Sequence, residues 1–415
     1  MKTPPALRHR RFTLLWGGLL ISMAGSQMQL AALLWHLRTL TDQPIVVSGI
    51  GLVRFLPILL FAPIGGVVAD SLNRRQVMFI TQTTMALTAA LLGVLTWNGQ
   101  ITIWQIYLLT AIQAIGISFD TPARQSLMPT LVPEEILPSA FSLTSIAIHT
   151  GAILGPALGG MVIGYFGQAY TYFINAISFV AVLAALVLMC PVSQESRPMA
   201  HGIRASLSSI REGVHFIWNQ PMILSSMMLD FLATFFSSAT TLLPFVARDI
   251  LKVGEVAYGW LASAESMGAV LVASLLSQKT RIRRQGPLLL AAVAAYGLAT
   301  ILFGLSRTYL GAMLSLVMVG GADSLSTVLR NTIRLMHTPD YIRGRMISIN
   351  QIFFMGGPQL GEIEAGMAAQ ALGTPLAIIT GGIGCLLGMV LIAMRWPQLR
   401  RYDDIEPVHV PAAVD

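Results

Sequence analysis

Long apolar runs alternate along the chain with short polar segments. Each run reaches the ~20 residues that a helix needs to cross about 30 Å of hydrocarbon. Twelve runs are predicted to span a membrane, with approximate limits at 12–37, 46–69, 76–97, 101–119, 139–165, 170–190, 222–247, 256–278, 287–306, 308–330, 346–371 and 375–394. The alternating ~10-residue segments of a membrane β-barrel do not occur. The predicted fold class is therefore an all-α polytopic membrane protein.

The composition agrees with this pattern. The 415 residues are 54% hydrophobic and only 11% charged, whereas soluble chains average roughly 25% charged residues. So few charges cannot cover a water-facing surface. The basic residues ahead of the run 12–37 resemble the start of a signal peptide, but that run is too long for one and further spans follow. We therefore predict a retained first helix.

One long connection divides the spans six and six. The predicted domains are an N-terminal six-helix bundle at 1–190, a cytoplasmic linker at 191–221, a C-terminal six-helix bundle at 222–395 and a cytoplasmic tail at 396–415. Within the linker, the 203–218 segment is amphipathic and is predicted to lie as a helix on the membrane surface.

The basic residues set the expected orientation. With the N-terminus inside, the cytoplasmic segments hold 21 of the 26 Lys and Arg residues, the external loops hold four, and Arg54 lies within a span. This bias predicts a multi-pass protein of the inner (cytoplasmic) membrane with both termini cytoplasmic. Anionic lipid accounts for the net charge of +7, so no nucleic-acid partner is expected. The two isolated cysteines predict neither a disulfide framework nor a metal site, and no cofactor is expected.

The fifth predicted span is unusually rich in glycine. Gly151, Gly155 and Gly159 recur every four residues and line one stripe of a helix. In lipid, such small residues let two helix backbones approach closely. Neighbouring helices can satisfy the carbonyl that Pro156 leaves unbonded. From spacing alone, this stripe is equally consistent with a simple tight helix contact.

The order of residues in this span is more specific. Gly151, Gly155-Pro156 and Gly159-Gly160 match every fixed position of gxxxGPxxGG, the fifth-helix pattern of proton-coupled exporters in the major facilitator superfamily. The chain therefore resembles that superfamily over essentially its whole length. Two further stretches, 120–135 and 340–348, resemble the branch that includes macrolide-efflux and enterobactin-export proteins.

A second superfamily pattern, G-x-x-x-D-R-x-G-R-R, lies between the second and third helices. Gly66, Asp70, Arg74 and Arg75 fit it, whereas Ser71 and Asn73 replace a basic residue and a glycine. Because asparagine tolerates a left-handed conformation, we expect the turn to be kept. The charge contact that the resemblance assigns to this motif is expected to be weaker here.

Ionisable residues within spans are functional candidates because they are costly to place in lipid. The proton-coupling and cavity candidates are Arg54, Asp230, Glu265, Asp323, Glu362 and Glu364. None lies in spans three, six, nine or twelve, which the resemblance makes peripheral. Glu265 is the first choice for the proton carrier, because an apolar cavity favours the protonated form of a carboxylate. Glu362 and Glu364 lie ~200° apart on their helix, so one of them is expected to face the cavity. The alternative is that some of these acids pair permanently with Arg54 or cap a helix.

These features predict a secondary active transporter that exports small amphipathic molecules, a drug, antibiotic or siderophore, by proton antiport with alternating access. Asp120 and Arg124 are predicted to form a gate contact at the cytoplasmic face. The expected partners are membrane lipid, a small-molecule substrate and a coupling proton, and the chain is expected to act as a monomer. The alternatives are a proton-coupled uptake symporter and a non-transporting receptor or scaffold. The sequence contains neither a HExxH nor a GxxxxGK[ST] pattern, so neither an enzyme nor direct ATP drive is expected.

Overall fold

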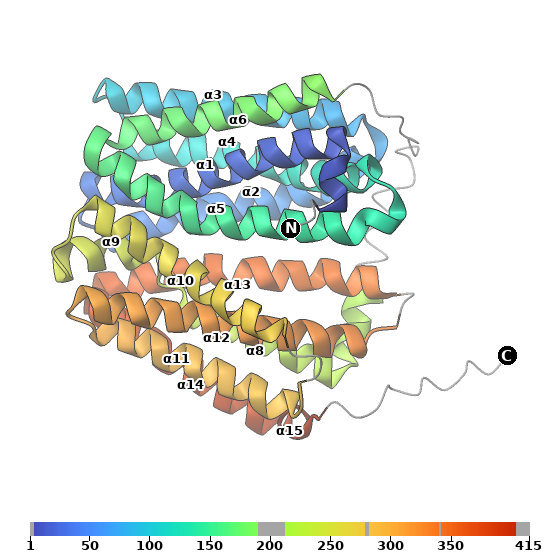
Figure 1. Ribbon diagram of the computed structural model, residues 1–415. Coiled ribbons are helices and arrows are strands. Elements are labelled where there is room, and N and C mark those ends of the chain that lie inside the picture. The colour runs from blue at the N-terminus through green and yellow to red at the C-terminus, as the bar shows by residue number, and fades with distance from the viewer. Residues whose placement is uncertain (1–3, 190–211, 279–281, 340–341, 404–415) are drawn as a thin grey trace. The chain divides into compact units, whose positions relative to one another are not determined.

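A computed structural model describes residues 4–189, 212–278, 282–339 and 342–403, except for the side chains of Asp70 and Ser348. Twelve long helical segments are present in these ranges (Figure 1). They are α1 (Arg10–Leu40), α2 (Pro44–Ser71), α3 (Arg74–Trp97), α4 (Ile103–Leu127), α5 (Leu137–Phe166), α6 (Gln168–Leu188), α8 (Pro221–Ser237) with its continuation to Ile250, α10 (Glu255–Leu276), α11 (Gln285–Leu305), α12 (Tyr309–Met336), α13 (Arg343–Leu372) and α14 (Thr374–Arg395).

Eleven of these segments are long and apolar enough to cross a membrane, in the part of the chain that the structure describes. The helix α13 is not among the eleven, although it is 30 residues long. It carries Glu362 and Glu364 within its length. The all-α polytopic fold is confirmed, and the predicted twelve spans correspond to twelve long helices.

Three predicted spans differ from the structure by more than three residues at one end. The span predicted at 222–247 is interrupted, because α8 ends at Ser237 and is followed by η5 (Thr240–Leu242), α9 (Leu243–Phe245) and a π-helical turn (Val246–Ile250). Pro244 lies in this irregular segment, where it lacks an amide hydrogen and restricts the residue before it.

The other two helices run beyond their predicted ends, to Leu127 in α4 and Met336 in α12. Their last turns carry charged residues that hydropathy alone assigns to loops. In the structure Asp120, Arg330 and Arg334 are buried. Arg330 is the last residue of the predicted tenth span and Arg334 lies beyond it, and both lie inside α12.

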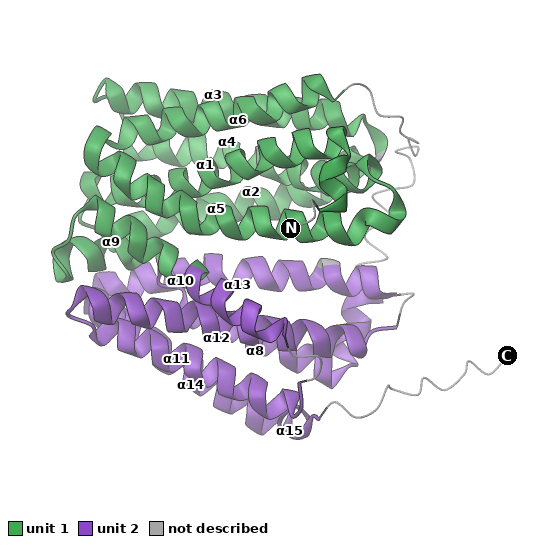
Figure 2. Ribbon diagram, in the orientation of Figure 1, with its two compact units in different colours: residues 1–203, 240–266 green, residues 204–239, 267–415 purple. Residues whose placement is uncertain are grey.

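The chain forms two compact units (Figure 2). Unit 1 comprises Met1–Ile203 and Thr240–Ser266, and unit 2 comprises Arg204–Ala239 and Met267–Asp415. Residues 240–266 thus belong with the first six helices. Most of the predicted amphipathic segment at 203–218 lies outside the described residues, and its end at 212–218 is helical. The predicted limits of the two bundles stay a prediction.

In unit 1, the glycine stripe of α5 packs on α1. A methyl group placed on Gly155 would lie 2.7 Å from the carbonyl oxygen of Ala24, and one on Gly159 would lie 3.1 Å from that of Met28. Gly160 faces Gly259 of α10 just as closely, and the Ser263 hydroxyl donates to the Ile153 carbonyl at 2.7 Å. That carbonyl is next to the one that Pro156 leaves without its helical donor. The stripe therefore forms a tight contact between α5 and α1, and the exporter role of the motif stays a prediction.

In unit 2, an apolar core surrounds the contact between α8, α11, α12 and α14. Its buried members include Leu229, Leu289, Leu329, Ile333 and Cys385. This core packs around the halves of α8 and α12 that are predicted to lie toward the cytoplasm. The same halves carry the charged residues described next.

Candidate functional site

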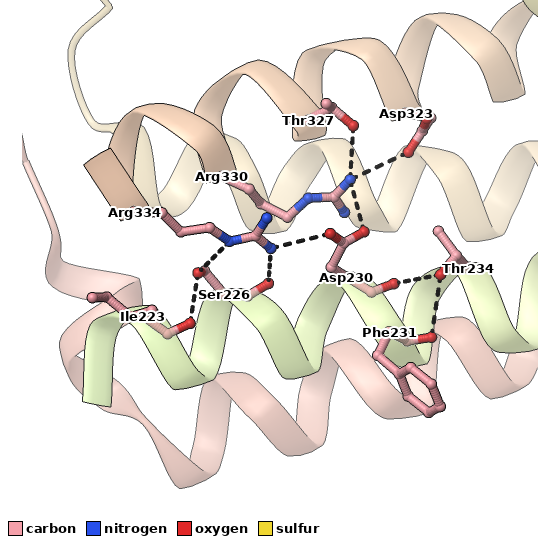
Figure 3. A network of polar contacts seen from close by, with 9 residues as sticks. All are labelled: Ile223, Ser226, Asp230, Phe231, Thr234, Asp323, Thr327, Arg330 and Arg334. Carbon is pink, nitrogen blue, oxygen red and sulfur yellow. Dashed lines mark hydrogen bonds and ion pairs between the residues drawn. The ribbon is translucent and has the colours of Figure 1, made fainter. Parts of the chain in front are cut away.

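Two helices of unit 2 bring four charged residues together (Figure 3). On α12, Asp323, Thr327, Arg330 and Arg334 follow one another at intervals of four, three and four residues, so they share one side of the helix. On α8, Asp230 lies one turn after Ser226. We call Asp230, Asp323, Arg330 and Arg334 the charge cluster.

Asp230 lies at the centre of the charge cluster. Its Oδ1 is 3.1 Å from Nη2 of Arg330, and its Oδ2 is 3.1 Å from Nη2 of Arg334. Asp230 is only 1% exposed, and the two guanidinium side chains are 2% and 3% exposed. A buried carboxylate is thus held between two buried cations.

Arg334 is fixed by further hydrogen bonds to α8. Its Nε donates to the hydroxyl of Ser226 at 3.1 Å, and its Nη2 donates to the Ser226 carbonyl at 2.9 Å. The Ser226 hydroxyl donates in turn to the Ile223 carbonyl at 2.8 Å. Charge-assisted bonds of this kind are the stronger ones in proteins, so Arg334 ties the end of α12 to α8.

Arg330 is shared between several oxygens. Its Nη2 donates to the Thr327 hydroxyl at 2.8 Å and to Oδ1 of Asp323 at 3.4 Å, and the same nitrogen is the one that faces Asp230. One guanidinium nitrogen of this kind carries two hydrogens. Three oxygens therefore compete for two hydrogens, and Oδ1 of Asp230 accepts no hydrogen bond from the described residues.

The two acids of the charge cluster differ in the exposure of their side chains. The side chain of Asp323 is 42% exposed, whereas that of Asp230 is 1% exposed. With both acids ionised, two carboxylates balance two guanidinium groups. Removing one charge from such a buried group leaves another uncompensated, which is costly. Asp323 and Asp230 thus face the same guanidinium nitrogen of Arg330.

The other predicted candidates lie on separate helices. Glu265 is partly buried on α10, and Arg54 is partly buried on α2. Glu362 is buried on α13, whereas Glu364 is half-buried on the same helix. In the described chain, Asp230 and Asp323 both form ion pairs with Arg330. The cation that these two predicted acids share is thus Arg330, whereas Arg54 was the predicted partner.

The motif between α2 and α3 is held by its arginines. Arg74 donates from Nε to the Ala69 carbonyl at 3.2 Å and from Nη1 to the Ser126 carbonyl at 3.0 Å, and so joins the ends of α2 and α4. Arg75 donates to the Val187 carbonyl at 3.4 Å. The predicted charge contact of Asp70 depends on a side chain outside the described residues, and Gly66 lies within α2.

The turn expected at Asn73 is present between the end of α2 at Ser71 and the start of α3 at Arg74, but Asn73 is not left-handed. Its φ is −65°, and its side-chain oxygen accepts from the backbone N–H groups of Arg75 and Gln76 at 3.1 and 3.4 Å. Asn73 is thus the N-cap of α3, a position that asparagine favours because its side chain satisfies free amide groups.

Asp120 and Arg124 pair within α4, with 3.8 Å between Oδ2 and Nε. Asp120 also accepts from the Thr81 hydroxyl at 3.1 Å and from the Gln82 amide at 2.9 Å, both on α3. These bonds fasten α3 to α4 within unit 1. The role of a gate stays a prediction.

Arg330 and Arg334 were not among the predicted site residues, because the tenth span was predicted to end at residue 330. A signal was nevertheless present. The apolar and polar pattern of α12 continues at helical spacing to Met336, and both arginines fall on the side of the helix that already carries Asp323. Basic residues at that spacing after an intramembrane acid indicate a continued helix with paired charges.

Comparison with known proteins gives matches over nearly the whole chain. The model of a family described as transmembrane secretion effector matches residues 3–413. The multidrug efflux pump Tap of Mycolicibacterium fortuitum is 25% identical over 389 residues, which cover 92% of this chain and 94% of Tap. The enterobactin exporter EntS of Shigella boydii serotype 18 is 26% identical over 345 residues, which cover 83% of this chain and 82% of EntS.

Solved structures are similar in fold. A bacterial homologue of the human lysosomal transporter Spinster, in an inward-facing and occupied conformation, has a TM-score of 0.73 at 14% identity and covers 98% of this chain and 100% of its own. A peptide transporter POT in complex with sulfate has a TM-score of 0.75 at 13% identity, with coverage of 94% and 95%.

Proposed function

This chain belongs to the transmembrane secretion effector family, and from this premise we propose that it exports small amphipathic molecules, drugs or siderophores, by exchange against protons. The resemblance to major facilitator exporters drawn from the motifs is confirmed by the family match and by the named relatives. The export direction is supported by two relatives that are named as an efflux pump and an exporter and that align over most of their lengths.

The observation that carries the proton coupling is the shared Arg330. Asp323 is the partly exposed acid, so it is the one that exchanges protons in this proposal. When Asp323 binds a proton it loses its charge, and the Nη2 hydrogen that it accepted becomes available to Asp230. The contact between α8 and α12 then strengthens. The resulting bias between two conformations is limited to the difference in proton affinity between them.

The location, orientation and monomeric state that we propose are those predicted from the sequence. The chain lies in the cytoplasmic membrane with both termini cytoplasmic, because its basic residues concentrate on that side. It works as a monomer and as a transporter rather than an enzyme. Its cargo site lies near the middle of the membrane, as in other secondary transporters, where Glu265, Glu362 and Glu364 are further candidates for cargo or proton contacts.

The test is proton movement in inverted membrane vesicles, followed with a pH-sensitive dye while macrolides, cationic dyes and catecholate siderophores are added in turn. One class is expected to trigger proton efflux from wild-type vesicles. Asp323→Asn should abolish that response without loss of the protein from the membrane. Glu265→Gln is the comparison variant, since it removes an acid outside the charge cluster.

Three results would count against the proposal. A response that survives Asp323→Asn but is lost in Glu265→Gln would move the proton to Glu265. A response that survives both variants would exclude each acid as the carrier. Accumulation of cargo in the direction opposite to export, in intact cells, would establish uptake instead.

A further inference from the structure

A short basic segment at the end of unit 2 folds back onto the start of α11. After α14 ends, α15 (Pro397–Arg401) follows, and its Leu399 is buried in the unit 2 core. The N–H of Gly286 donates to the Tyr402 carbonyl at 3.0 Å, and the N–H of Arg284 donates to the Asp403 carboxylate at 2.6 Å. The segment after α14 is therefore docked beside α11, and the two helices are neighbours in Figure 1.

This docking gathers exposed arginines at one corner of unit 2. We define the basic corner by its five members, all exposed: Arg283, Arg284, Arg395, Arg400 and Arg401. In the two docked stretches, 282–286 and 395–403, the acidic residue is Asp403, and its carboxylate already accepts from the backbone of Arg284. The basic corner thus carries a local excess of positive charge that these stretches do not neutralise.

An apolar strip leads along α14 to the basic corner. Leu387, Leu391 and Met394 follow at intervals of four and three residues, so they share one side of the helix, and all three are exposed, Met394 by 75%. Trp396 begins the next turn, with the Arg395 guanidinium 5.3 Å from its ring centre. Tryptophan and arginine at the end of an apolar span are typical of the membrane–water boundary.

We propose that the basic corner binds the phosphate headgroup of an anionic phospholipid, whose acyl chains lie along the strip of Leu387, Leu391 and Met394. Arginine guanidinium groups match phosphate oxygens in geometry and charge. One feature supports a lipid rather than a free anion, because Arg395 lies on the same helix as the exposed apolar strip. This site is independent of the cargo and of the coupling ion.

The test uses the purified full-length protein in neutral detergent, titrated with phosphatidylglycerol or with phosphatidylcholine of the same acyl chains, and native mass spectrometry to count bound lipids. Wild-type protein is expected to prefer phosphatidylglycerol by at least about tenfold, and the triple variant R395Q/R400Q/R401Q to lose that preference. The matched control is R248Q/K252Q/R307Q, which removes three exposed cations away from the corner and should keep the preference. The lysine triple R395K/R400K/R401K should keep the preference but bind more weakly, because lysine retains the charge without the planar guanidinium group.

Several outcomes would overturn the proposal. Equal losses in the glutamine triple and its control would mean that net charge alone attracts the lipid. Full displacement of phosphatidylglycerol by millimolar inorganic phosphate would mean an anion site without acyl-chain contacts. If wild-type protein shows no preference and D404N/E406Q/D415N gains one, the acidic end of the chain itself occupies the basic corner.

Discussion

Unit 1 and unit 2 each contain a close contact between two long helices, and they achieve it by opposite chemistry. In unit 1, α5 approaches α1 through glycines, where even an added methyl group would collide with backbone atoms. In unit 2, α8 and α12 are joined by ion pairs of 3.1 Å around a buried carboxylate. The first contact depends on shape and the second on charge.

This difference matters for a membrane transporter. Contacts between small residues in lipid depend on close van der Waals packing and do not change when a proton arrives. A buried ion pair is sensitive to the loss of a single charge. Under the proposed function, α1 and α5 therefore form a constant structural contact, whereas the contact of α8 with α12 responds to protonation.

The largest effect is expected at the charge cluster, which joins α8 to α12. Asp230→Asn leaves two buried guanidinium groups without their central carboxylate, so the free energy of unfolding should fall by about 3–5 kcal/mol. Unfolding in mixed micelles, followed by tryptophan fluorescence, measures it. Asp42→Asn is the control, because it removes an acid that also pairs with an arginine but is 91% exposed.

A second substitution makes this prediction sharper. Asp230→Asn combined with Arg334→Met removes one acid and one base, so charge balance returns and part of the stability should return with it. If Asp230→Asn is as stable as wild type, or if adding Arg334→Met lowers stability further by its full separate effect, the charge cluster does not hold α8 to α12.

The next largest effect is expected at the glycine contact between α5 and α1. In Gly155→Ala the new methyl group would lie 2.6 Å from Cβ of Gln27 and 2.7 Å from the Ala24 carbonyl, so α5 and α1 must separate. The expected loss of unfolding free energy is about 1–3 kcal/mol. Gly17→Ala on α1 is the matched control, because nothing lies within 4 Å of its new methyl group. A control that destabilises as much as Gly155→Ala would contradict the contact.

A smaller effect on stability, with a clear effect on activity, is expected for Arg330→Lys. An ammonium group carries three hydrogens, enough for Asp230, Asp323 and Thr327 together, so the competition between the two acids ends. Stability should fall by no more than about 1–2 kcal/mol, while the pH dependence of cargo-driven proton movement becomes flat. The pH profile is the decisive measurement, since a merely structural arginine would lower the rate equally at every pH.

The sequence predicted the fold well because lipid imposes simple rules. Span length and apolar composition located eleven of the twelve segments to within a few residues at most ends, and the four-residue spacing of Gly151, Gly155 and Gly159 predicted a packed stripe. The interruption after Ser237 was missed, because no charged residue follows before Arg248, although Ser238, Thr240, Thr241 and Pro244 lie in that stretch. Hydropathy does not distinguish a continuous helix from short turns of equal composition.

The candidate site was predicted only in part, for a physical reason. Asp230 and Asp323 were identified because acids within apolar runs are unusual. Arg330 and Arg334 were not predicted as site residues, because charged residues at the end of an apolar run look the same whether they face water or pair inside the bundle. Their pairing depends on α8, which is about one hundred residues earlier in the chain. Only the tertiary structure brings these helices together.

The smallest expected effect is the coupling energy of a neutral polar contact in unit 1. Measuring it shows whether a buried polar contact without charge behaves as the charge cluster does. In unit 1, Gln29 of α1 donates to Gln113 of α4 and accepts from Asn175 of α6, both at 2.7 Å, and all three residues are buried. These groups are neutral, so a double-mutant cycle of Gln29→Leu and Asn175→Leu should give a coupling of only about 0.6 kcal/mol, the average for polar contacts between membrane helices. The same cycle on Asp230 and Arg334 should give several times more, because each single variant leaves a buried charge unpaired. Equal couplings in the two cycles would mean that burial of polar groups, rather than their charge, distinguishes unit 2 from unit 1.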